Sequence, residues 1–411
     1  MSGIDIRGID AATPPDRDRG VDALRALAIL GVVLGHWLVT ALVVDSGTVR
    51  GASPLRQLPQ LTPVSWVFQT LAVFFLVGGH VGANGYASAR ARGGTYGRWL
   101  GARMSRLFRP VAAVLVVWTA AAGAMLASGA DAEAVRTLVK LVLSPLWFLL
   151  VFAVLTAVTP LAARLHPVVP LAVVALVDLF RLGLGGPAWL GWVNVAAGWL
   201  VPYCLGAAWA RSAERGHAAW AKGGLTSRAA WVMGGLTSRA GGWALLLGGA
   251  AASAGLVLWG GYPAAMVGVP GAAVSNLDPP TLAAVTFGLA QCGAALLLLG
   301  PLRRALRRPA AWAAVALVNL SAMTVFLWHQ TAMIAVTAIG LLAGVLPGLH
   351  TVPDGFGWVL ARLAWLPAFA VALLVCWAAF RTYEQGRPQT RGGATTVRER
   401  PPADSPTARH A

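Results

Sequence analysis

The chain is poor in charged residues. Asp, Glu, Lys and Arg make up 11% of its 411 residues, whereas a soluble domain carries about 25%. Hydrophobic residues make up 57%. This composition excludes an ordinary soluble domain and predicts an all-α, polytopic integral membrane protein.

Cysteine and lysine are also scarce. The three cysteines, Cys204, Cys292 and Cys376, each lie inside an apolar run without a CxxC partner. The sequence therefore predicts neither a disulfide framework nor a metal site. Only Lys140 and Lys222 are lysines among 32 basic residues. Such a preference for arginine is typical of GC-rich coding and suggests a bacterial source.

The formal net charge is +17, a value that could suggest a nucleic-acid partner. Nucleic-acid binding needs a basic face on a soluble domain, and here the basic residues lie in short blocks between apolar runs. Such blocks are typical of membrane topology signals. We therefore expect membrane lipid around the chain and no nucleic acid.

Several apolar runs approach the length of about 20 residues that a helix needs to cross a bilayer. The fifth run is short, and the ninth is too long for one straight crossing, so residues 311–346 either cross once or form a broken helix. The ten predicted runs are 22–44, 63–88, 110–129, 138–160, 167–183, 189–210, 243–260, 281–301, 311–340 and 359–381.

The basic residues divide unequally between alternate loops. With the N-terminus inside, 25 of the 32 Lys and Arg residues lie in inner segments and six in outer segments, with Arg25 inside the first run. Because inner loops of membrane proteins are rich in Lys and Arg, this asymmetry predicts a multi-pass cell-membrane protein with both termini in the cytoplasm.

Both ends of the chain are polar. Residues 1–20 lack the pattern of a signal peptide, and we expect a disordered cytoplasmic N-terminus there. Residues 384–411 are rich in Arg, Pro and Thr, a composition that predicts a disordered cytoplasmic tail. Residues 21–383 then form one membrane domain.

Two ionisable residues stand in the first apolar run. Arg25 and His36 are eleven positions apart, so they share one helix face about 16 Å apart along its axis, and Asp22 joins that face within ion-pairing range of Arg25. Intramembrane ionisable residues are costly and often functional. The structural alternative is that Arg25 reaches the headgroups and His36 bonds a neighbouring helix. As a functional residue, His36 could deprotonate a hydroxyl or carry an acyl group, and the sequence does not choose between them.

These residues open a stretch that resembles the acyltransferase-3 family of integral membrane acyltransferases. The signature of that family is a basic residue followed, after ten residues, by His. Four further segments resemble family landmarks in the same order, and the resemblance covers residues 18–383. The five segments are VDALRALAILGVVLGHW, VFFLVGGHVGANGY, RWLGARMSRLFRP, PLWFL and MTVFLWH.

The resemblance implies transfer of an acyl group, acetyl in the expected case, from acyl-CoA to a hydroxyl of a carbohydrate, glycolipid or secondary metabolite. It implies that His36 and Arg25 are catalytic and that Arg103 and Arg106 bind the phosphates of the acyl donor. No bound cofactor is implied, since acyl-CoA is a co-substrate. Gly78 departs from the family pattern, in which Ser is commoner, so a donor-site role for a Ser hydroxyl is not expected here.

Two alternatives accompany this interpretation. If its helix starts near Ala311, His329 lies at a depth similar to that of His36, and it is either a second site residue or a structural histidine. The function could instead be export of a lipid or glycolipid. A transporter usually shows two related halves, and the sequence shows no such halves.

Overall fold

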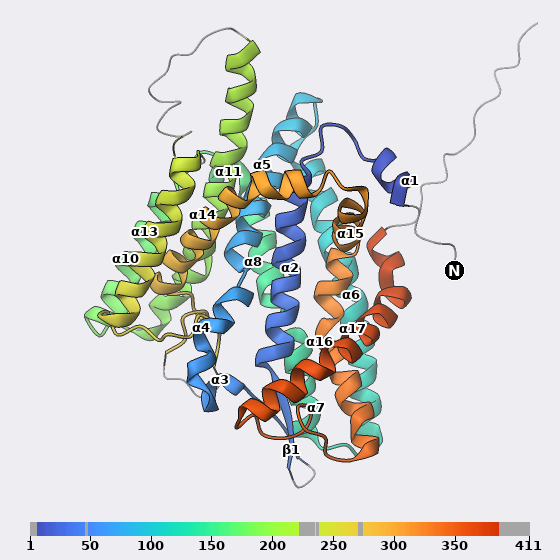
Figure 1. Ribbon diagram of the computed structural model, residues 1–411. Coiled ribbons are helices and arrows are strands. Elements are labelled where there is room, and N and C mark those ends of the chain that lie inside the picture. The colour runs from blue at the N-terminus through green and yellow to red at the C-terminus, as the bar shows by residue number, and fades with distance from the viewer. Residues whose placement is uncertain (1–5, 46–47, 222–234, 236–237, 270–273, 386–411) are drawn as a thin grey trace, which may run out of the picture.

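The computed structural model describes residues 6–45, 48–221, 235, 238–269 and 274–385. These residues form a bundle of helices with one small β-hairpin at one end (Figure 1). Strands β1 (Ala41–Asp45) and β2 (Thr48–Ala52) pair antiparallel, with Ala41 opposite Ala52. We call this the hairpin end, and we call the opposite end, where the first short helix lies, the α1 end.

Nine helical stretches within the described residues are long and apolar enough to cross a membrane. They confirm an all-α, multi-pass membrane protein. Helices α7 and α8 together form one of these stretches. The main helices of the nine stretches are α2 (Arg19–Val39), α5 (Leu71–Ala91), α6 (Tyr96–Ala127), α7 (Ala132–Leu143), α8 (Leu146–Ala157), α11 (Val193–Ala221), α13 (Arg239–Leu258), α14 (Leu282–Ala305), α16 (Ala322–Gly340) and α17 (Phe356–Gln385).

Shorter elements connect or flank these helices. Helix α10 (Val168–Asp178) continues into the π-helical turn η3 (Leu179–Gly183), and the two together correspond to the short fifth predicted run. The remaining short helices are α1 (Ile6–Ala11), α3 (Pro54–Gln57), η1 (Pro59–Leu61), α4 (Thr62–Ser65), η2 (Trp66–Phe68), α9 (Thr159–Ala162), η4 (Ala188–Trp192), α15 (Pro309–Leu320) and η5 (Leu341–Ala343).

The long ninth run is a broken helix. Helix α15 ends at Leu320 and α16 begins at Ala322, with Ser321 between them in a non-helical conformation. The Ser321 hydroxyl accepts a hydrogen bond of 2.5 Å from the Trp377 indole on α17. Helix α15 lies at the α1 end, and α16 continues toward the hairpin end (Figure 1).

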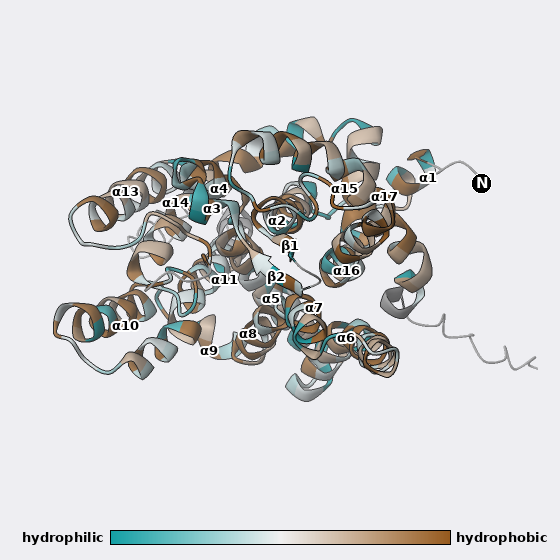
Figure 2. Cartoon of the chain, turned by 90° about the horizontal axis from the view of Figure 1, so that it is seen from below, coloured by the Kyte–Doolittle hydropathy of each residue, from teal (hydrophilic) through white to brown (hydrophobic). Residues whose placement is uncertain are grey.

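Apolar side chains cover the outside of the bundle. Figure 2, the view onto the hairpin end, shows α2 in the interior and α10 and α13 at one edge, with many hydrophobic residues along the outer helices. Leu247 on α13 is 62% exposed and Val371 on α17 is 61% exposed. Lipid tails are as apolar as these side chains, so this surface suits a protein surrounded by lipid.

Helix α1 packs against α15 at one end of the bundle. The Trp312 indole donates a hydrogen bond of 2.8 Å to the Thr13 hydroxyl, and the Arg19 guanidinium lies 4.9 Å from the Trp312 ring centroid. Residues from Ile6 onward thus form a short helix and turn in contact with α15, and the expectation of disorder stays a prediction for residues 1–5. The polar composition gave no sign of this contact with an aromatic side chain 299 positions away.

Asp18 fixes the start of α2. Its carboxylate accepts a hydrogen bond of 3.0 Å from the Gly20 amide and forms an ion pair with Arg303 on α14. Burial alone would raise the pKa of Asp18, but the hydrogen bond and charge of Arg303, with the nearby backbone amides, lower that pKa below its usual value. Asp18 thus ties the start of α2 to α14.

The polar tail begins where the last helix ends. Helix α17 reaches Gln385, so the first two residues of the expected disordered tail, 384 and 385, belong to a helix. Residues 386–411 lie outside the described part of the chain, and the expectation of disorder stays a prediction for them.

Candidate active site

Helices α2 and α16 pack together and place two histidines side by side. The His36 and His329 ring centroids are 5.1 Å apart. His36 lies in the last turn of α2, and His329 is fully buried on α16. The Trp37 indole donates a hydrogen bond of 2.9 Å to the His329 carbonyl, which links the two helices at this level.

Each imidazole of this pair has one nitrogen bonded to α16. His36 Nδ1 lies 3.0 Å from the Gln330 side-chain nitrogen, and His329 Nδ1 lies 2.6 Å from the Phe326 carbonyl oxygen. A carbonyl oxygen only accepts hydrogen bonds, so neutral His329 carries its proton on Nδ1. His329 Nε2 is then a lone-pair nitrogen, buried without a hydrogen-bond partner among the described residues.

A cavity of about 260 Å³ lies between α2, α5, α6, α8 and the α15–α16 break. Three arginines line it, one from α2 and two from α6. Both of these helices begin at the α1 end (Figure 1), so the basic part of the cavity lies toward that end. The lining residues that carry the argument are Arg25, Arg103, Arg106, Phe148, Phe152 and Phe326.

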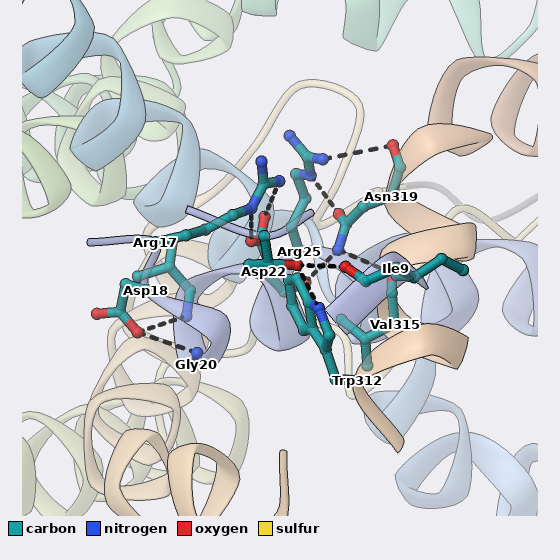
Figure 3. Close-up of polar contacts among 11 residues, drawn as sticks. Ile9, Arg17, Asp18, Gly20, Asp22, Arg25, Trp312, Val315 and Asn319 are labelled. Carbon is teal, nitrogen blue, oxygen red and sulfur yellow. Dashed lines mark hydrogen bonds and ion pairs between the residues drawn. The ribbon is translucent and has the colours of Figure 1, made fainter. Parts of the chain in front are cut away.

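Asn319, the residue before the last of α15, fixes the position of Arg25 (Figure 3). The Arg25 Nε donates a hydrogen bond of 2.5 Å to Asn319 Oδ1, and Arg25 Nη2 lies 3.4 Å from the Asn319 carbonyl oxygen. The Asn319 side-chain nitrogen donates to the carbonyl oxygens of Asp22 (2.8 Å) and Val315 (3.1 Å). The Asp22 carboxylate, which the sequence placed near Arg25, bonds instead to Arg17 at 2.6 Å.

Arg103 and Arg106 differ in their surroundings although they lie one turn apart on α6. The Arg103 guanidinium donates to the Val81 carbonyl oxygen at 3.2 Å and lies 5.1 Å from the Trp99 ring centroid. Its Nε is buried without a partner among the described residues. Arg106 is more exposed and donates from Nε to the Ala102 carbonyl oxygen at 3.1 Å. Both side chains line the cavity, as their spacing predicts.

An aromatic residue connects the cavity with the histidine pair. Phe326 lines the cavity, and its ring centroid lies 6.0 Å from that of His329 and 5.5 Å from that of Phe148. The histidine pair therefore lies one aromatic residue away from the cavity lining, and neither histidine lines the cavity itself. The basic part of the cavity lies toward the α1 end, and His36 lies near the hairpin end.

Comparison with protein families gives one match that spans nearly the whole chain. Residues 18–381 match the model of the acyltransferase-3 family, described as an acyltransferase domain. The chain belongs to the acyltransferase-3 family. Comparisons with curated proteins and with solved structures gave no match.

Membership of the acyltransferase-3 family makes this chain a membrane O-acyltransferase, with an acyl donor and a hydroxyl-bearing acceptor. It favours the enzyme over the exporter that the sequence left as an alternative. Among the described residues, no three or more His, Cys, Asp or Glu side chains cluster closely enough to hold a metal ion.

Gly78, where the resemblance leads to an expectation of Ser, lies against Phe152. A Cβ atom at Gly78 would lie 2.5 Å from the Phe152 Cε2 atom. The Phe152 ring thus occupies the space that a side chain at position 78 would need, and it forms part of the cavity wall. Nearby His80 stacks on Trp209 with 3.9 Å between ring centroids, its Nε2 lies 3.1 Å from the Asn84 side-chain nitrogen, and it does not line the cavity.

Three polar residues of the site region were missed by the sequence reasoning. Asn319 and Gln330 are uncharged, and Arg362 was counted only as an outer basic residue. Arg362 is 1% exposed and donates to the carbonyl oxygens of Trp37 (2.6 Å), Thr40 (2.6 Å) and Gly348 (2.9 Å). A rule that treats every polar residue of an apolar run as a candidate would have found all three.

Proposed function

We propose that this enzyme transfers an acyl group, acetyl in the expected case, from acyl-CoA to a hydroxyl of a carbohydrate, glycolipid or secondary metabolite. The observation that carries the proposal is a cavity lined by three arginines and several phenylalanines, with Phe326 of its lining next to the His36–His329 pair. The basic part of the cavity suits the phosphates of a coenzyme A donor, and its apolar part suits the acyl end.

The donor site is proposed on the chemistry of Arg103 and Arg106, and Arg25, which the resemblance implied as a catalytic residue, lines the same cavity and joins this set. An arginine guanidinium is planar and donates two hydrogen bonds at once, which matches a phosphate. Asn319 holds Arg25, and Arg103 is partly buried with its Nε unpartnered among the described residues. A buried cationic donor without a partner is costly, so an anionic ligand would stabilise this arrangement.

The proposed cytoplasmic side of the membrane is the α1 end. The basic blocks before α2, between α5 and α6, and after α14 all belong to the segments assigned as inner. The rule that inner loops are basic then places both termini in the cytoplasm of a bacterial cell. Acyl-CoA is made in the cytoplasm, so the basic part of the cavity would open toward its source.

The chemistry is proposed at His36. In the direct route, His36 accepts the proton of the acceptor hydroxyl while its oxygen attacks the acyl carbon. The carbon–sulfur bond breaks, and the proton passes from His36 to the leaving thiolate, so that an ester and free coenzyme A result. In the other route, a His36 nitrogen attacks the acyl carbon and the carbon–sulfur bond breaks, so that the thiolate leaves. The hydroxyl oxygen then takes the acyl group from His36, and the hydroxyl proton passes to the thiolate.

Acetyl is the expected acyl group because the cavity is small and phenylalanine rings line it. The Phe148 and Phe326 centroids are 5.5 Å apart, and Phe148 also lies 4.9 Å from Phe74. The cavity has a volume of about 260 Å³ and would also hold part of the coenzyme A moiety of the donor. The remaining space suits a short acyl chain.

The donor assignment is tested with purified protein in liposomes, acetyl-CoA and release of free thiol. The variant Arg103→Lys with Arg106→Lys keeps both charges and loses the planar guanidinium groups. Each charged hydrogen bond lost is worth about 1.5–3 kcal/mol, so KM for acetyl-CoA should rise by about tenfold or more.

The matched control is Arg50→Lys with Arg136→Lys, because both residues lie outside the cavity lining. This variant should keep the parent KM. An unchanged KM in the Arg103→Lys, Arg106→Lys variant would show that these arginines serve topology alone and that the donor binds elsewhere.

A further inference from the structure

Two consecutive residues of α2 bond two consecutive residues of α16. The Trp37 indole donates to the His329 carbonyl oxygen at 2.9 Å, and His36 Nδ1 lies 3.0 Å from the Gln330 side-chain amide. Gln330 is fully buried. The bond from Trp37 fixes the backbone next to Gln330, so the Gln330 side chain is held against one particular nitrogen of His36.

A glutamine amide can meet an imidazole nitrogen in two ways. If its NH₂ group donates, His36 Nδ1 accepts and the proton of neutral His36 is on Nε2. If the amide is rotated by 180°, its oxygen accepts from Nδ1–H, and Nε2 has a free lone pair. The two amide orientations have the same shape. In the first orientation the Gln330 Oε1 atom is buried without a partner among the described residues.

Only the second orientation lets His36 act as a base or as an acyl carrier through Nε2. A nitrogen that already bears the proton cannot accept another from a hydroxyl, and it cannot attack an acyl carbon with a lone pair. His329 Nδ1 donates to the Phe326 carbonyl oxygen, and its Nε2, which could accept a proton, has no hydrogen-bond partner among the described residues. The residue that bonds His36 Nδ1 is Gln330.

We propose that Gln330 is the positioning residue that sets the tautomer of His36, with its side-chain oxygen accepting the Nδ1 proton during the reaction. The inference rests on the proposed role of His36. In the direct route, the hydroxyl O–H bond breaks, its proton goes to His36 Nε2, the oxygen–carbon bond forms and the carbon–sulfur bond breaks. The thiolate then takes that proton from Nε2, while Nδ1–H stays bonded to Gln330.

Substitutions at Gln330 separate tautomer control from packing. Gln330→Glu supplies an oxygen that accepts a hydrogen bond from His36 Nδ1. Gln330→Met keeps the approximate size of the side chain but has no amide group to donate or accept that hydrogen bond. Loss of a residue that orients a metal-bound histidine typically lowers activity about 10–100-fold, and the same factor is expected for a residue that orients His36. We expect kcat of thiol release to fall by that factor in Gln330→Met, with KM for acetyl-CoA within about twofold of the parent. Gln330→Glu should keep kcat within about tenfold of the parent.

The matched control is Gln291→Met. Gln291 lies on α14, and its side-chain amide donates to the Gln69 carbonyl oxygen outside the cavity lining. This variant makes the same substitution in another membrane helix and should keep the parent kcat. A parent-like kcat in Gln330→Met overturns the inference. An equal loss in Gln330→Glu and Gln330→Met, which indicates packing alone, overturns it too.

A second measurement does not depend on turnover. Solid-state NMR of the full chain in lipid, labelled with ¹⁵N-histidine, reports which ring nitrogen bears the proton, and His36→Ala identifies the His36 signals. We expect the His36 proton on Nδ1 in the parent and in Gln330→Glu. A proton on Nε2 in the parent would contradict the inference whatever the kinetics. Parent-like turnover in His36→Ala overturns the proposed function of His36 instead, so the two failures are distinguishable.

Discussion

Replacing Asn319 by Leu tests how the donor cavity is organised. The side chain keeps its approximate size and loses the oxygen that accepts from Arg25 Nε at 2.5 Å. It also loses the two bonds that its nitrogen donates to carbonyl oxygens on α2 and α15. Arg25 then has to be ordered by the donor itself, so donor binding should weaken.

The size of this effect follows from the bond that is lost. A hydrogen bond to a charged group is worth about 1.5–3 kcal/mol, and about 1.4 kcal/mol corresponds to a factor of ten in affinity. We expect Kd for acetyl-CoA, measured by titration calorimetry of the purified protein, to rise by about 10- to 100-fold.

Asn194→Leu is the matched control for this prediction. Asn194 is fully buried and does not line the cavity. Its side-chain nitrogen donates a hydrogen bond of 2.9 Å to the Asp178 carboxylate. Both variants should lose stability, and only Asn319→Leu should lose donor affinity. The reasoning is refuted if Asn319→Leu, folded by size-exclusion chromatography, binds acetyl-CoA as tightly as the parent.

Three further predictions concern other parts of the molecule. Gly78→Val should displace the Phe152 ring, which lies 2.5 Å from the position of the added Cβ, and should raise KM for acetyl-CoA severalfold. If adding Phe152→Ala does not restore the parent KM, displacement of the ring is not the cause. Arg362→Met removes three hydrogen bonds from a buried cation to carbonyl oxygens, each worth about 1.5–3 kcal/mol. The Tm of the purified protein should therefore fall, and an unchanged Tm would show that these bonds do not stabilise the fold. Reporter fusions at the C-terminus should be active only in the cytoplasm, and an external signal would contradict the assigned orientation.

The sequence predicted those features that each helix carries by itself. The length of the hydrophobic runs predicted the membrane-spanning helices. The shortest run, 167–183, is the one that the structure divides into α10 and η3. Arg103 and Arg106 lie three positions apart on α6, and both line the cavity because i, i+3 residues of a helix are neighbours.

Contacts between helices that are distant in the sequence could not be predicted from hydrophobic length and spacing. Arg25 meets Asn319 and His36 meets Gln330 across 294 positions in each case. Hydrophobic periodicity tells which side of a helix is apolar, but it does not tell which helix packs against which. The sequence could therefore place His36 and His329 at similar depths, and only the fold brings their rings to 5.1 Å.

The break between α15 and α16 shows the same limit. The run was too long for one crossing, so a broken helix was one of two predicted outcomes. At the break, the Trp377 indole from another helix donates a hydrogen bond to the Ser321 hydroxyl, a contact that the run itself does not reveal. That break places Asn319 in the cavity wall beside Arg25.

The central claim is that His36 carries acyl transfer from acetyl-CoA, and one measurement tests it most directly. Parent and His36→Ala protein, purified in parallel into liposomes, are given acetyl-CoA and membrane extract as the source of acceptor. Free thiol and acetyl ester are then quantified together. Loss of a general base typically lowers the rate about 10²–10⁴-fold, so His36→Ala should release thiol and form ester at least about 100-fold more slowly than the parent. Near-parental formation of both products by folded His36→Ala would contradict the account.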